Sequence, residues 1–239
     1  MNTVASKVSV ETSVPLHGFV LADELELRSR RMASRRKRVR TRALLLAVAA
    51  RELERVGYEA LTVEHVAQAA GMTRATFYQY YSSRAHITAG LLGKYWALMR
   101  ARRPTGGARR SLRESIHRTN CFSVMLASMN PNLLAAKETL LREDPKTAAR
   151  MTHVNRLWAK RILRDLIRRG LAKPEGDDLP YLMMKARAVI NMSDSLLSDV
   201  YRMADWDGRD GPVDLELVIK VMDDLWLDGL YSTQRLVPK

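Results

Sequence analysis

The chain of 239 residues is long enough for one or two domains, and its 46% apolar content can supply a sizeable core. No apolar stretch reaches the roughly 18 residues of a membrane helix, and the first 20 residues lack a secretory signal pattern. One cysteine, Cys121, excludes an intrachain disulfide and suits a reducing compartment, so we expect a cytoplasmic protein with no membrane partner.

The formal net charge is +14, and it is unevenly distributed along the chain. Residues 1–103 contain 18 Lys+Arg and 8 Asp+Glu, whereas residues 104–239 contain 22 and 18. An electropositive N-terminal part suits a polyanion, because each neutralised phosphate releases condensed counterions. Charge alone leaves a solvated surface or a ribosome-like tail open as alternatives.

Residues 1–36 are predicted to be a flexible basic arm, with at most a short helix at Ala22–Leu27. Nine cations and no carboxylate lie between Arg28 and Arg42, and such dense like charge disfavours a compact fold without a partner. The arm either lies along DNA phosphates or in a minor groove, or is a disordered tail with non-specific attraction.

A DNA-binding domain is predicted at residues 37–92, because three short helical patterns there are separated by glycine and by helix-capping residues. Gly57 ends the first, Gly71 follows the second, and Thr73 can cap the third. The predicted helices are Arg42–Val56, Thr62–Ala70 and Arg74–Tyr80, and a fourth runs from Ser82 or Ser83 to about Arg102.

The remainder, residues 93–239, is predicted to be a helical regulatory and dimerisation domain. Its amphipathic stretches are separated by proline and glycine groups, and no strand-like alternation flanked by turn residues occurs anywhere. The predicted fold is therefore all-α, with helices at about 109–129, 132–142, 146–170, 178–204 and 214–230.

The segment 61–84 has the pattern of a helix-turn-helix, whose second helix enters the major groove. Met72, Phe77 and Tyr81 are spaced to pack inward, which leaves the opposite face of the third helix to DNA. Arg can bind guanine and Gln can bind adenine through two hydrogen bonds each. Arg84 lies in the first turn of the next helix, where its positive charge opposes the helix dipole. A phosphate bound there would stabilise both the helix N-terminus and the Arg84 cation, and the alternative is an arginine free in solvent.

Residues 42–92 resemble the DNA-binding region of the tetracycline-repressor (TetR) family. The matching elements are Gly57-Tyr58, Thr62-Val63, Ala70-Gly71-Met72, Thr76-Phe77-Tyr78 and Ser83-Arg84. The departures from the family pattern are Met72, Tyr80, Tyr81 and Arg84, of which the last three stand where His, Phe and Lys are usual.

The resemblance implies contacts of this segment with DNA, although a solvated helix surface is the alternative for each residue. It implies phosphate contacts from Thr62, Thr76, Tyr78, Tyr80 and Arg84, and base contacts from Arg74, Ala75 and Gln79. Thr73, at the start of the third helix, is included in the predicted DNA-binding set.

The resemblance also implies that the last two long helices form a homodimer through a four-helix bundle. Residues at helical spacing support this, and the alternative is a helix that is internal to a monomer. The predicted interface is Val189, Ser193, Leu196, Val200, Val218, Met222 and Leu225.

Members of this family usually enclose a small-molecule cavity in the regulatory domain. Adaptable apolar side chains are candidates to line it, although ordinary core packing is the commoner reason for such residues. The candidates are Phe122, Met125, Met129, Met151, Trp158 and Met184. The sequence contains no phosphate loop, zinc-type cluster or nucleophile elbow, so we expect no enzyme, metal or cofactor.

These features together predict a sequence-specific transcriptional regulator. The expected mechanism is a repressor dimer that places two recognition helices about 34–36 Å apart on a palindromic operator and is released by an apolar small-molecule effector. The alternative is a TetR-like fold that organises the nucleoid or binds a protein, without a small-molecule effector.

Overall fold

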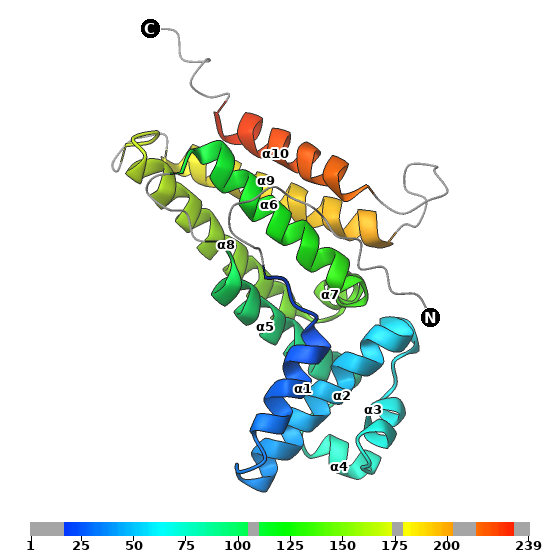
Figure 1. The fold of residues 1–239 in the computed structure, drawn as a ribbon. Coiled ribbons are helices and arrows are strands. Elements are labelled where there is room, and N and C mark those ends of the chain that lie inside the picture. The colour runs from blue at the N-terminus through cyan, green and yellow to red at the C-terminus, as the bar shows by residue number, and fades with distance from the viewer. Residues whose placement is uncertain (1–16, 105–109, 174–178, 203–213, 232–239) are drawn as a thin grey trace, which may run out of the picture.

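The computed structural model describes residues 17–104, 110–173, 179–202 and 214–231, and all the regular elements in these ranges are α-helices (Figure 1). This architecture confirms the predicted all-α class. The helices are α1 (Leu21–Arg31), α2 (Lys37–Ala60), α3 (Val63–Ala69), α4 (Arg74–Tyr78), α5 (Arg84–Arg102), α6 (Leu112–Met129), α7 (Pro131–Glu143), α8 (Pro145–Arg168), α9 (Leu179–Arg202) and α10 (Leu215–Tyr231).

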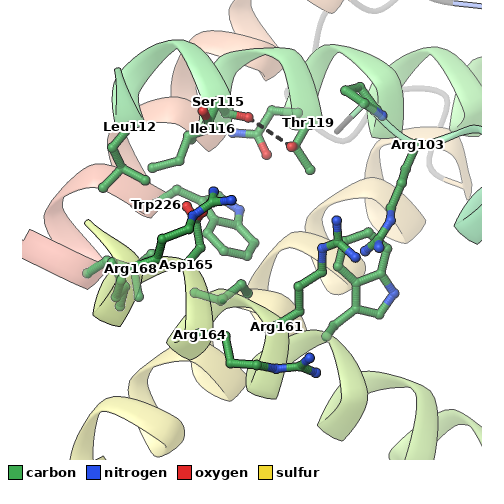
Figure 2. Close-up of a pocket in the computed structure, with 16 residues that line it drawn as sticks. Arg103, Leu112, Ser115, Ile116, Thr119, Arg161, Arg164, Asp165, Arg168 and Trp226 are labelled. Carbon is green, nitrogen blue, oxygen red and sulfur yellow. Dashed lines mark hydrogen bonds and ion pairs between the residues drawn. The ribbon is translucent and has the colours of Figure 1, made fainter. Parts of the chain in front are cut away.

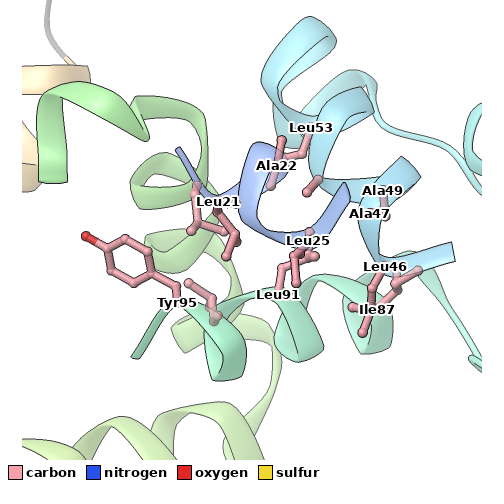
Figure 3. Close-up of a cluster of buried hydrophobic side chains, with 14 of the residues drawn as sticks. Leu21, Ala22, Leu25, Leu46, Ala47, Ala49, Leu53, Ile87, Leu91 and Tyr95 are labelled. Carbon is pink, nitrogen blue, oxygen red and sulfur yellow. The ribbon is translucent and has the colours of Figure 1, made fainter. Parts of the chain in front are cut away.

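The prediction of a flexible arm is wrong for residues 17–36, whereas residues 1–16 lie outside the described residues. Leu21, Ala22 and Leu25 of α1 are buried between α2 and α5 (Figure 3). Acidic residues in the first turn and arginines in the last also complement the helix dipole. The dense positive charge therefore occupies the exposed end of a packed helix and the turn after it.

The helix-turn-helix has the predicted order, and its two turns depend on glycine. Gly57 bends α2 near its end with φ of 73°, and Gly71 joins α3 to α4 with φ of 65°, a region that other residues rarely adopt. Phe77 and Tyr81 are almost fully buried, as predicted, and Met72 packs partly against the same core.

Helix α5 belongs to both halves of the molecule. Its Ile87 and Leu91 join the core beneath the helix-turn-helix, and its Tyr95 and Trp96 reach toward α6–α9. The predicted boundary between residues 92 and 93 therefore falls within one continuous helix. None of the described helices is both long and apolar enough to cross a membrane.

Most of the predicted dimer interface lies inside the protomer. Val189, Ser193, Val200, Val218 and Met222 are buried where α9 and α10 pack against each other and against α6 and α7. The α9–α10 crossing is close, because a Cβ added to Gly229 would lie 2.7 Å from Val189.

Two further members of that set, Leu196 and Leu225, are partly buried, and Leu196 packs against the same core. The error arose because each helix has two apolar faces and the sequence does not say which one turns inward. The large apolar residues exposed on α9 and α10 are instead Tyr181, Met184, Met192, Leu217 and Val221.

Candidate nucleic-acid interface and ligand cavity

Side-chain caps fix the two short helices of the helix-turn-helix. Thr62 Oγ1 accepts a hydrogen bond from the backbone N–H of His65 at 3.1 Å, which caps α3. Thr73 Oγ1 likewise accepts from the N–H of Thr76 at 3.2 Å and pairs with the Thr76 hydroxyl at 3.0 Å. Each cap satisfies a backbone donor that the first helical turn leaves without a partner.

The outward face of α4 presents most of the predicted DNA-contacting side chains. Thr73, Arg74, Ala75 and Gln79 are exposed, and Tyr78 is 47% exposed. In the absence of DNA, Arg74 pairs with Glu64 of α3 at 2.6 Å, a partner that sequence reasoning missed. A guanine contact by Arg74 would have to replace this ion pair, which is exposed and therefore weak.

Two predicted phosphate contacts are less accessible than the rest of the set. Thr76 is half-buried beside its cap, and Tyr80 is half-buried against the core of the domain. The roles of all these residues toward DNA stay predictions.

Arg84 has a structural role that the sequence did not indicate. Its Nη1 faces the carbonyl oxygens of Tyr58, Glu59 and Leu61 at 3.0, 3.1 and 3.2 Å. Its guanidinium carbon also lies 4.5 Å from the centre of the Tyr58 ring. Arg84 is therefore neither free in solvent nor held for a phosphate alone: it ties the start of α5 to the connection between α2 and α3.

We expect Arg84→Ala to destabilise the helix-turn-helix rather than only weaken DNA binding. Hydrogen bonds to a charged group contribute about 1.5–3 kcal/mol, so we expect a loss of roughly 2 kcal/mol in urea unfolding. The matched control is Arg55→Ala, which removes an exposed arginine whose partner, within the described part of the chain, is Glu52 of its own helix. This change should alter stability by about 0.5 kcal/mol or less. Unchanged stability with reduced DNA affinity would show that Arg84 acts on phosphate instead.

The helix-turn-helix sequence matches a known family. Residues 45–91 fit the model of bacterial regulatory proteins of the tetR family. These residues therefore form a DNA-binding region of the TetR type. The match supports a role in DNA-binding transcriptional regulation, and it covers α3, α4, residues 45–60 of α2 and residues 84–91 of α5.

Solved structures share the fold of this chain. The fatty acid degradation regulator FadR from Bacillus halodurans aligns with a TM-score of 0.57 and 16% identity, over 80% of this chain and 96% of that chain. Thermus thermophilus FadR, a TetR-family repressor solved in complex with lauroyl-CoA, aligns with a TM-score of 0.54 and 20% identity, over 83% and 96%. No curated protein matches this sequence significantly.

The C-terminal half of the chain contains a cavity of about 310 Å³ between α6, α8 and α10. Figure 2 shows Leu112, Ile116 and Thr119 on the α6 side and Arg161, Arg164 and Asp165 on the α8 side. Both apolar and cationic side chains thus line this cavity. Its other lining residues are Arg103, Pro104, Ser115, Asn120, Trp158, Ile162, Leu166, Arg168, Trp226 and Leu230.

A second cavity of about 110 Å³ adjoins the first, since Thr119, Asn120, Trp158 and Trp226 line both. It extends among aromatic and methionine side chains of α5 and α8 toward Lys137 and Asp194. Asn155 Nδ2 donates to Asp194 Oδ2 at 3.3 Å, and burial raises the pKa of the Asp194 carboxyl although Lys137 partly offsets this.

Of the predicted lining residues, Met151 and Trp158 face the cavities. Met184 does not, because it is 64% exposed on α9. Phe122 is buried in the core next to α1, and Met125 and Met129 contact the segment at Gly18. Sequence reasoning missed the arginines, although residues 161, 164, 165 and 168 recur one turn apart along one helix face.

Cys121 behaves as a buried apolar residue. It is 3% exposed, and burial raises the pKa of its thiol to about 11, so it stays protonated at neutral pH. His117 Nδ1 lies 2.6 Å from Asp223 Oδ2, and Asn120 donates to the other oxygen of Asp223 at 2.8 Å. These groups join α6 to α10 beside the cavities.

Proposed function

We propose that the protein is a homodimeric repressor that binds a two-fold symmetric DNA site and is released by a small molecule in the adjoining cavities. The observation that carries this proposal is the position of α5. Leu92, Tyr95, Trp96 and Met99 of α5 line the smaller cavity, while Arg84 at the other end of the same helix holds the α2–α3 connection. A ligand that displaces α5 would therefore shift the helix-turn-helix of each protomer.

Two copies are needed because one helix-turn-helix buries too little surface to select a single genomic site. The exposed apolar residues Met184 and Met192 of α9 and Leu217 and Val221 of α10 are our revised candidates for the dimer face. The two residues on each helix are separated by about one or two helical turns, so they lie near one face of it. That face could be buried against the same face of a second protomer.

The effector that best fits the larger cavity is an amphipathic anion. Apolar side chains such as Ile116, Ile162 and Leu166 would accept an apolar chain, and Arg103, Arg161 and Arg164 would face a phosphorylated or carboxylate head. The similarity in fold to a repressor solved with lauroyl-CoA makes an acyl-CoA the first candidate. This proposal adds an anionic head to the apolar small molecule expected from the sequence.

Selection from a random DNA pool, followed by fluorescence anisotropy, tests the DNA-binding part of the proposal. The protein should enrich one two-fold symmetric sequence, and lauroyl-CoA should lower its affinity for that sequence. Coenzyme A and laurate, tested separately, should act only at higher concentrations, because each offers one half of the interaction. Tight binding with no enriched sequence would favour a nucleoid-organising protein, and no effect of any of the three compounds would contradict this effector class.

Substitutions on α8 test where the effector binds. Arg161→Ala should raise the lauroyl-CoA concentration needed for release by about tenfold or more, since a charge-assisted contact contributes about 1.5–3 kcal/mol. Arg156→Ala is the matched control, because Arg156 is exposed on the same helix and does not line the larger cavity. Equal responses of the two variants would place the ligand elsewhere.

A further inference from the structure

The densest run of Lys and Arg in the sequence lies outside the region that matches the TetR family. We call the nine Lys and Arg residues between positions 28 and 42 the basic corner; all nine are exposed, at the end of α1, in the following turn and at the start of α2. Since the family match begins at residue 45, nothing in it assigns a role to this surface.

The basic corner is held in place rather than mobile. Leu21 and Leu25 anchor α1 in the core between α2 and α5 (Figure 3). Asn130, just before α7, binds the N-terminal end of α1. Its Oδ1 accepts a hydrogen bond from the N–H of Leu21 at 2.8 Å, and its Nδ2 donates to the carbonyl of Phe19 at 2.9 Å. Because the backbone of α1 is already fixed, binding a partner would have to order only the side chains of the corner.

The carboxylates of α1 pair with arginines outside the basic corner, so they do not neutralise its positive charge. Asp23 and Glu26 both pair with Arg51, at 2.6 and 2.9 Å, and Glu24 pairs with Arg102 at 2.7 Å. Arg31, Arg35, Arg36 and Arg38 form no side-chain hydrogen bond or ion pair within the described part of the chain.

The corner lies at the same end of the molecule as the recognition helix. Figure 1 shows the turn between α1 and α2 at the end where α4 is found. The guanidinium carbon of Arg42 also lies 5.2 Å from the centre of the Tyr81 ring, just after α4. Positive charge continues onto α5, where burial and the nearby Arg28 and Arg42 lower the pKa of Lys94.

We propose that the basic corner is a second DNA-contacting element, which binds backbone phosphates beside the major groove entered by α4. Arginines without acidic partners, fixed beside the recognition helix, are complementary in charge to the phosphates of the duplex. Contacts with phosphates do not read the base sequence. The corner would therefore lengthen the site and add affinity that depends on salt. This inference rests on the proposed DNA-binding function.

The test neutralises four corner residues together in the full chain: Arg31, Arg35, Arg36 and Arg38 are each replaced by Gln. The matched control replaces four exposed cations of the regulatory half, Arg113, Lys146, Arg156 and Lys160, by Gln, so both variants lose the same charge. Anisotropy titrations on the selected DNA sequence over 50–200 mM salt give the slope of log K against log salt, and hydroxyl-radical footprints give the protected length.

The corner variant should have a shallower slope, by about 1.8 per dimer even if each corner makes only one phosphate contact. Its footprint should shorten at the outer edges while the preferred sequence is retained, and the control should match the wild type. An unchanged slope and footprint in a corner variant with native helicity would overturn the inference. If the wild-type protein selects no DNA sequence, the proposed function fails instead.

Discussion

Replacing Val221 or Met184 by glutamate is expected to leave the protomer folded and to dissociate the proposed homodimer. Both side chains are exposed, at 40% and 64%, so a glutamate at either position is solvated in the monomer. In a two-fold interface each substitution buries two like charges, at a cost of several kcal/mol. We therefore expect the dimer to weaken by about 100-fold or more and operator binding to fall with it.

Sedimentation of the purified variants measures the dimer fraction, and anisotropy measures operator affinity. Leu157→Glu is the matched control, because Leu157 is 43% exposed on α8, outside the proposed interface. Glutamate at Leu196 should behave differently from both, since its partly buried side chain packs against the core and the substitution should destabilise the fold. A Val221→Glu protein that remains dimeric would place the interface on another face, and a monomeric wild type would exclude the two-site mechanism.

Replacing Lys137 by methionine is expected to destabilise the C-terminal helical part of the fold by about 3 kcal/mol. Lys137 is 4% exposed, its Nζ lies 3.2 Å from Glu138 Oε1, and it is the cation that partly offsets the burial of Asp194. Methionine retains the length of the side chain but leaves the two carboxylates without their cation. Urea unfolding should show the loss, and Lys146→Met, at an exposed position on α8, should show almost none.

The loss in Lys137→Met should depend on pH, because burial already raises the pKa of Asp194 in the folded protein. A carboxyl with a raised folded pKa retains its proton on folding, so stability falls as pH rises from the ordinary aspartate value, 3.8, toward the folded value. The deficit of the variant should therefore be smaller at pH 4.5 than at pH 7.5. Adding Asp194→Asn to Lys137→Met should recover part of the lost stability at pH 7.5. If the loss is equal at both pH values and Asp194→Asn recovers none of it, lost packing is the cause.

Local patterns predicted the helix-turn-helix because its elements depend on neighbouring residues. Thr62 and Thr73 cap the helices that directly follow them, and Gly71 makes a turn of only a few residues. Capping and positive φ angles are short-range requirements, so they can be recognised in a single sequence without knowledge of the tertiary fold. The inward spacing of Phe77 and Tyr81 follows from the helical period in the same way.

The tertiary structure alone decided which way the other helices face. Val189 and Met222 belong to apolar stripes that are equally suitable for a core or a partner, and only the packing of α9 and α10 against α6 and α7 placed them inside. The tertiary fold likewise decided what the charged residues contact. Arg84 contacts carbonyl groups more than 20 residues away, and the basic corner begins on α1, a helix that Asn130 holds in place. The sequence by itself determined the helices and the DNA-binding motif, because these follow from local periodicity. The ligand cavity, the candidate dimer face and the basic corner required the structure, because each depends on contacts between segments far apart in the chain.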